Sequence, residues 1–112
     1  MIYLTAGVPD LAEQDFQKAV GVEPELGEAY VNRGISEMHM DQVHEALADL
    51  DHGLTFKLEE PWKAYYNRGI ALERLGDITG AYHSYQKASE LKPDWADPKR
   101  ELTRFKLQPP KP

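Results

Sequence analysis

The chain contains no cysteine among its 112 residues. Disulfide scaffolds, thiolate metal sites and cysteine nucleophiles are therefore excluded. It also lacks any apolar run that approaches the ~20 residues of a membrane-spanning helix. Residues 1–7 have neither the basic start nor the long apolar core of a signal peptide. The compartment stays open: we expect a cytoplasmic protein, or a periplasmic or envelope protein if an upstream signal has been removed.

Positive charge is scarce. Thirteen lysines and arginines stand against 19 aspartates and glutamates, for a formal net charge of −6. Nucleic-acid-binding domains are normally basic, so we expect no nucleic-acid partner. The first sixty residues hold thirteen acidic and three basic side chains, whereas the remainder holds six and ten. Either the exposed helix faces are simply solvated, or this asymmetry orients a partner along the long axis.

An internal repeat is the strongest feature of the sequence. Residues 30–35, YVNRGI, return as residues 65–70, YYNRGI, at an offset of 35. Ala46 and Ala81 continue the match at the same offset, and Ala12 matches Ala46 at an offset of 34. A period near 34 is typical of stacked helical hairpins, in which each unit buries its apolar stripe against the next.

The residues at fixed positions of this repeat resemble those of the tetratricopeptide repeat family. The middle repeat shares Tyr30 and Gly34 but departs from the family pattern at Glu37, Gly53 and Leu58. The last repeat has the expected residue type at seven positions: Tyr65, Gly69, Leu72, Ala81, Tyr85, Ala88 and Pro93. This Tyr-Asn-Arg-Gly variant is similar to repeats of bacterial envelope proteins, which suggests a bacterial origin.

The resemblance implies an all-α fold, an α-solenoid of antiparallel helix-turn-helix repeats in a right-handed superhelical stack. We expect one domain over 1–107, with a partial repeat at 1–26, full repeats at 27–61 and 62–95, and a capping helix at 95–107. The expected helices are 9–21, 27–40, 43–57, 62–75, 78–91 and 95–106, and Leu102 and Phe105 should cover the last repeat. The proline-rich tail, 108–112, should be disordered. Because the first repeat starts mid-helix, either upstream repeats or a signal have been removed, which we favour, or the first helix is naturally short.

In this family the first helices of successive repeats line a concave groove that holds a partner. The resemblance therefore predicts a partner-binding set on two helical faces: Glu28, Val31, Asn32, Ile35, Met38, His39, Lys63, Tyr66, Asn67, Ile70, Glu73 and Arg74. Ordinary packing between repeats is an equal interpretation of Val31, Ile35 and Ile70. For Met38 and Tyr66 exposure in the groove is favoured.

Some family members clamp the terminal carboxylate of a partner. Asn32 and Lys63 match two positions of that clamp, but Asn67 stands where an arginine is needed, so we do not expect it here. Arg33 and Arg68 replace a usual leucine and are interpreted as structural. A helical ion pair between Arg33 and Glu37, four residues later, is one candidate contact.

No pattern in the sequence points to catalysis or to a cofactor. His39 and His44 lie five residues apart across a predicted turn, which does not suit a helical zinc site. There is no glycine-rich phosphate loop and no setting for a serine nucleophile. We expect a non-catalytic adaptor without metal or cofactor that binds a peptide or helix of another protein. The alternatives are a homo-oligomerisation or spacer element that pairs through exposed solenoid ends, and a regulatory fragment of a larger protein.

Overall fold

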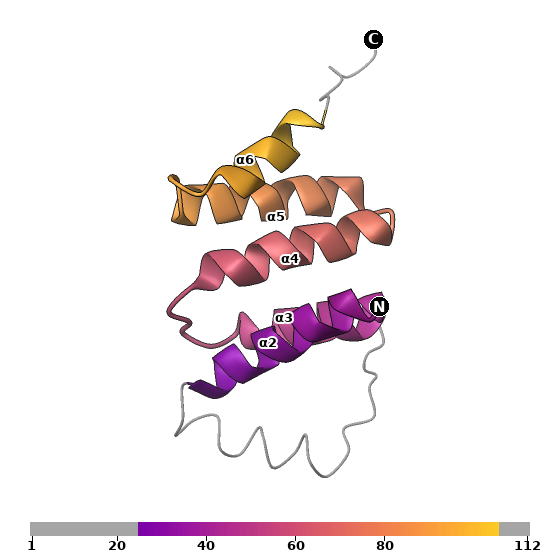
Figure 1. Cartoon of the computed structure of the whole chain (residues 1–112), viewed down its shortest axis with the longest axis vertical. Coiled ribbons are helices and arrows are strands. Elements are labelled where there is room, and N and C mark those ends of the chain that lie inside the picture. The colour runs from indigo at the N-terminus through magenta and orange to yellow at the C-terminus, as the bar shows by residue number, and fades with distance from the viewer. Residues whose placement is uncertain (1–24, 106–112) are drawn as a thin grey trace.

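The computed structural model describes residues 25–105, which form antiparallel helical pairs stacked in one row (Figure 1). The first pair packs against the second, and a final helix packs against the second pair. The helices are α2 (Glu25–His39), α3 (Val43–Gly53), α4 (Pro61–Arg74), α5 (Ile78–Leu91) and α6 (Ala96–Thr103). The predicted all-α fold of stacked helix-turn-helix units is confirmed. The predictions for residues 1–24 and for the tail at 108–112 lie outside the described residues.

The two turns inside the pairs have the same geometry at an offset of 35 residues. Asp41 and Gly76 both have positive φ, 60° and 88°. The next N–H along the chain then reaches back over the helix end: Gln42 N–H donates to the Glu37 carbonyl at 2.8 Å, and Asp77 N–H to the Leu72 carbonyl at 2.9 Å. This closure satisfies carbonyls that the helix leaves unpaired. The sequence repeat is therefore also a repeat of backbone conformation.

Small residues allow the two helices of each pair to approach closely. A Cβ on Gly34 would lie 2.9 Å from Leu50 Cγ, and a Cβ on Gly69 would lie 2.7 Å from Tyr85 Cε1. Leu50 and Tyr85 are themselves 0% and 1% exposed. The glycine and the large residue that faces it fill one space, which explains why the repeat pattern joins them.

α3 ends at Gly53, whereas the sequence predicted a helix to residue 57. Phe56 N–H donates to the Gly53 carbonyl at 3.1 Å in a turn. The turn carries the Phe56 ring back over α2, where it stacks 6.2 Å from the Tyr30 ring. The helix therefore ends at a glycine, a poor helix former, just before the turn that places Phe56 on Tyr30. Among the described residues no helix has the length and apolar character needed to cross a bilayer.

The two arginines that replace a family leucine are structural, as predicted, but the predicted partner of the first is wrong. Arg33 forms two bonds to Asp49 of α3, at 2.7 and 2.8 Å, in place of the expected pair with Glu37. Arg68 donates to Ser84 of α5 at 2.8 Å and to Asp51 of α3 at 2.6 Å. The latter bond joins the first pair to the second.

Candidate binding face

The first helices of the two pairs, α2 and α4, lie side by side and present related rows of side chains. Four residues of each helix recur at an offset of 35 and at the 4-3-4 spacing that keeps side chains on one helical face. We call these eight residues the two-stripe face: Glu28, Asn32, Ile35 and His39 of α2, and Lys63, Asn67, Ile70 and Arg74 of α4. Asn32, His39, Lys63 and Arg74 are exposed, and the other four are half-buried. All eight belong to the predicted partner-binding set.

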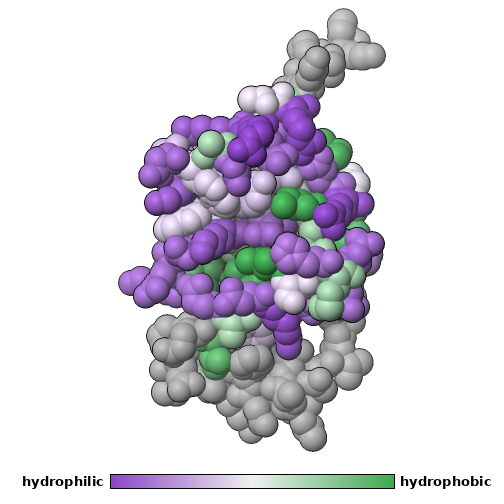
Figure 2. Space-filling view, viewed as in Figure 1, coloured by the Kyte–Doolittle hydropathy of each residue, from purple (hydrophilic) through white to green (hydrophobic). Residues whose placement is uncertain are grey.

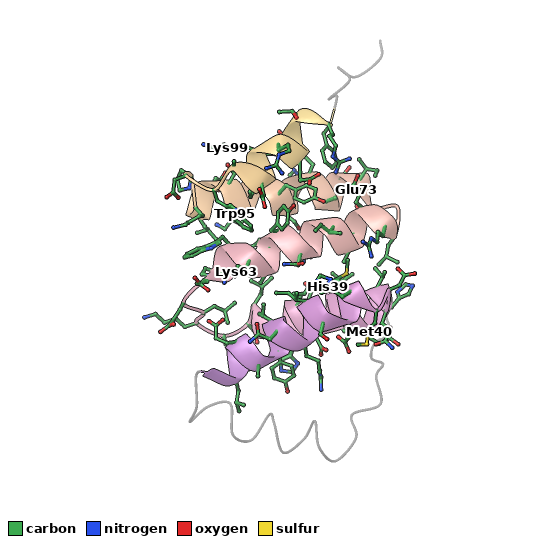
Figure 3. All side chains as sticks on the ribbon, in the orientation of Figure 1. His39, Met40, Lys63, Glu73, Trp95 and Lys99 are labelled. Carbon is green, nitrogen blue, oxygen red and sulfur yellow. The ribbon has the colours of Figure 1, made fainter. Side chains whose placement is uncertain are left out.

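The dimensions of this face follow from helix geometry. The first and last residues of each stripe are eleven residues apart in sequence, which is about 16 Å at 1.5 Å per residue, and packed helices lie about 8–10 Å apart. Lys63 lies near one end of the face and His39 near the other (Figure 3). Apolar surface is visible between α2 and α4 on an otherwise mainly hydrophilic side (Figure 2). Such a face matches about five residues of an extended chain, or three turns of a helix.

The apolar centre of the face is anchored in the core. Ile35 packs against the buried cluster of Val31, Leu50 and Ala64, and Ile70 packs against the cluster that contains Ala71. Both isoleucines are half-buried, so each still offers part of its side chain to a partner. Their positions are fixed by the packing beneath them.

The polar members of the face make weak or local contacts. Lys63 pairs with Glu60 at 2.7 Å, and both side chains are about half exposed. Arg74 lies 3.5 Å from both the Met38 carbonyl oxygen and Asp41. Exposed pairs of this kind contribute only about 0–1 kcal/mol, so a partner can replace them at little cost.

One amide and one carboxylate of the face are held more firmly. Asn67 Nδ2 donates to the Lys63 carbonyl of its own helix at 2.9 Å. Glu28 accepts the N–H of Glu59 at 2.8 Å and so ties α2 to the loop before α4. These bonds orient the stripes without covering them.

The other four residues of the predicted set pack between helices. Val31 and Met38 are 3% and 6% exposed and contact α4 through Ala64 and Ala71. The expected exposure of Met38 is therefore wrong. The side chain fills the gap between the pairs, because this position of the helix points at the next first helix.

Tyr66 and Glu73, the equivalents of Val31 and Met38 one repeat later, face α6 in the same way. The Tyr66 hydroxyl donates to Glu101 at 3.3 Å, and its ring lies 4.9 Å from that of Trp95. Arg104 donates two bonds to Glu73, at 2.8 and 2.9 Å. α6 thus takes the place beside α4 that α4 takes beside α2.

These contacts change the titration of both groups. Burial raises the pKa of Tyr66, and the nearby Glu101 carboxylate adds to the increase. The bonds from Arg104 hold the pKa of Glu73 below its usual range, against a smaller opposing effect of burial. Glu73 also accepts the Tyr85 hydroxyl at 3.0 Å, so it joins α4, α5 and α6.

The sequence missed this charged seam between α4 and α6. It predicted that Leu102 and Phe105 cover the last repeat, which is confirmed, but it assigned no contact to the charged residues of the final helix. Glu101 and Arg104 instead turn toward α4. The repeat could have predicted this seam. Tyr66 and Glu73 are equivalent to Val31 and Met38, and residues at these positions contact the helix that follows the pair.

With this geometry established, the matches to known proteins become informative. The model of the tetratricopeptide repeat family matches residues 62–94, which cover α4 and α5. Residues 62–94 form a tetratricopeptide repeat. Tetratricopeptide repeats are generally protein–protein interaction modules and are typically non-catalytic. Among the described residues no three histidine, aspartate or glutamate side chains are grouped to hold a metal ion.

Two curated proteins are similar to the chain. The human mitochondrial import receptor subunit TOM70 is 34% identical over 58 residues, which cover 52% of this chain and 10% of that protein. The rat NADPH oxidase activator 1 is 25% identical over an alignment of 123 residues, which covers 96% of this chain and 27% of that protein. The chain thus spans only a small part of the length of either relative.

Proposed function

We propose that the two-stripe face binds a short segment of another protein, either extended or helical, and that the chain acts as a non-catalytic adaptor. The observation that carries the proposal is the repetition of the face. Each of the two helices carries, in the same order, a charged residue, an asparagine, an isoleucine and a histidine or arginine. All eight are exposed or half-buried, and equivalent residues are 35 positions apart. The buried residues Val31 and Met38 lie beside the α2 stripe and support it, while the stripe itself stays exposed or half-buried.

The chemistry of the face indicates what such a segment would contain. The isoleucine centre would accept an apolar side chain, since burial stabilises by about 25 cal/mol per Å² of apolar surface. Asn32 and Asn67 would donate to and accept from the backbone of an extended segment. The names of the two relatives, a receptor subunit and an activator, support a role in recognising other proteins.

The test uses peptides selected from a random phage-displayed library on the unmodified chain. Their affinities are then measured by fluorescence anisotropy for the double variant Lys63→Glu, Arg74→Glu. A matched control, Lys87→Glu with Lys99→Glu, changes the net charge equally at exposed positions of α5 and α6. We expect affinity to fall by about tenfold or more in the first variant and to stay within about twofold in the control.

Circular dichroism spectra and sedimentation velocity should show that all three proteins are equally helical and of equal mass. An equal loss of affinity in both variants would mean that only overall charge matters. Unchanged affinity in the first variant would place peptide binding away from the two-stripe face. Either result contradicts the proposal.

A further inference from the structure

Two carboxyl groups meet in the interior of the first helical pair. Asp49 of α3 is 6% exposed, and both of its oxygens accept bonds from Arg33. The Glu37 carboxyl of α2 lies close enough to Asp49 for the two carboxyls to interact. One Glu37 oxygen, Oε1, is buried and has no hydrogen-bond partner among the described residues. The family pattern has an aromatic residue or leucine where Glu37 stands, and Leu72 occupies that place one repeat later.

Among residues 25–105, Arg33 is the cation that acts on both carboxyls. Arg33 uses its paired N–H groups on Asp49, and Glu45 adds a further negative charge near Glu37. Two neighbouring carboxylates, one largely buried and one with a buried oxygen, are costly to ionise together, so one of them holds a proton. Because Asp49 has the arginine, the proton belongs on Glu37, which then donates it to Asp49.

We propose that this protonated Glu37–Asp49 contact is a proton-dependent lock that holds α2 to α3 and thereby sets how firmly α2 presents its stripe of the two-stripe face. The proposal rests on the proposed function only for that last step. The connection runs through the chain: Met38 follows Glu37 and packs on Ala71, and Leu50 follows Asp49 and packs with Ala64. The two residues next to the carboxyls are thus among those that join the first pair to α4.

The pH range of the lock follows from its surroundings. Burial, followed by the Asp49 carboxyl, raises the pKa of Glu37 from its usual 4.5 to about 8, although Arg33 opposes the increase. Between these values the folded chain keeps a proton that the unfolded chain releases, so unfolding becomes easier as pH rises. The stabilisation is complete below about pH 4.5 and is lost as pH rises through about 8.

The first measurement is the unfolding equilibrium constant in urea at several pH values between 6 and 9. Glu37→Gln keeps the size of the side chain and a donor for Asp49, so it imitates the protonated form. We expect the ratio of the unfolding constant of the unmodified chain to that of Glu37→Gln to rise by up to about tenfold per pH unit. This rise should stop at about pH 8. Glu90→Gln, at an exposed position of α5, should follow the unmodified chain. Identical slopes for the unmodified chain and Glu37→Gln would overturn the lock.

A second measurement needs no variant. The side-chain carboxyl carbons of the unmodified chain, labelled with carbon-13, are titrated by NMR. One glutamate signal should titrate above pH 7, and ordinary titration of every glutamate near pH 4–5 would overturn the proposal. This result decides the question even where Glu37→Gln fails to fold.

The link to the face is tested with a peptide selected on the unmodified chain. Its affinity should fall several-fold between pH 6 and 8.5 for the unmodified chain and change less for Glu37→Gln. If the affinities of the two proteins depend equally on pH even though their unfolding constants differ in pH slope as expected, the lock does not control binding. That outcome would overturn the proposed regulation. Because the unfolding and NMR measurements use no peptide, failure of the adaptor function is recognised separately.

Discussion

The contact between Gly69 and Tyr85 allows a sharp prediction about what holds a helical pair together. In most helices a Gly→Ala change stabilises, because alanine gains about 1 kcal/mol of helix propensity in a helix interior. At Gly69 the new Cβ would lie 2.7, 2.8 and 3.1 Å from three atoms of the Tyr85 ring. Carbon atoms normally pack at about 3.5–4.0 Å, so the ring would have to move by about 1 Å.

The Tyr85 ring has no room for that movement. It is 1% exposed, its hydroxyl is bonded to Glu73 at 3.0 Å, and its ring centre lies 5.7 Å from both Tyr66 and Phe105. Overpacking a core costs about 1–3 kcal/mol, and the gain in propensity offsets about 1 kcal/mol of that cost. We therefore expect Gly69→Ala to lower the free energy of unfolding by up to about 2 kcal/mol, equivalent to a fall in Tm of up to roughly 16 °C.

Urea unfolding followed by circular dichroism at 222 nm measures the change. The control is a double-mutant cycle with Tyr85→Ala, which removes the side chain that a Cβ on Gly69 would meet. In that background the ring is absent, and Gly69→Ala should be neutral or stabilising, with a coupling energy above about 1 kcal/mol. If Gly69→Ala alone raises stability, the ring does not limit how closely the helices approach.

Three further predictions concern α5, the seam between α4 and α6, and Tyr66. Asp77→Ala should cost about 1 kcal/mol in urea denaturation, because the carboxylate caps α5 by accepting the Gly80 N–H at 2.9 Å, and Asp77→Asn should cost less. Because Arg104 lowers the pKa of Glu73, the stabilisation from this pair is lost as pH falls through that lowered pKa. Hydrogen-exchange protection of α6 should therefore fall in acid, and Glu73→Gln should remove this pH dependence. Tyr66→Phe should cost less than about 1 kcal/mol, whereas Tyr66→Ala should cost about 3 kcal/mol in the same denaturation assay.

Much of the fold was accessible from the sequence because the repeat fixes both spacing and residue size. The predicted helix at 78–91 agrees with α5, and the predicted helix at 62–75 is displaced by one residue from α4. The stripes of the two-stripe face also follow from the offset of 35, since equivalent residues occupy equivalent faces. Their role in binding stays a prediction.

What the sequence could not give depends on contacts between distant residues. α3 ends at Gly53, and the following turn places the Phe56 ring on α2, a contact that local propensity does not describe. Arg33 has Glu37 as a local candidate partner, but it pairs with Asp49, sixteen residues away. The sequence showed Glu37 only as a departure from the family pattern. Its buried carboxyl contact became visible when α3 was placed beside α2.

The bridge made by Arg68 has a consequence for how the array comes apart. Stacked repeats unfold one unit at a time when the coupling between neighbours is weak, and together when it is strong. Arg68 holds Ser84 of its own unit and Asp51 of the preceding one with a single guanidinium group. Loss of either unit removes a bond from the other, so the bridge adds to the cooperativity of unfolding. The same side chain that replaces a core leucine thus helps two hairpins to behave as one thermodynamic unit.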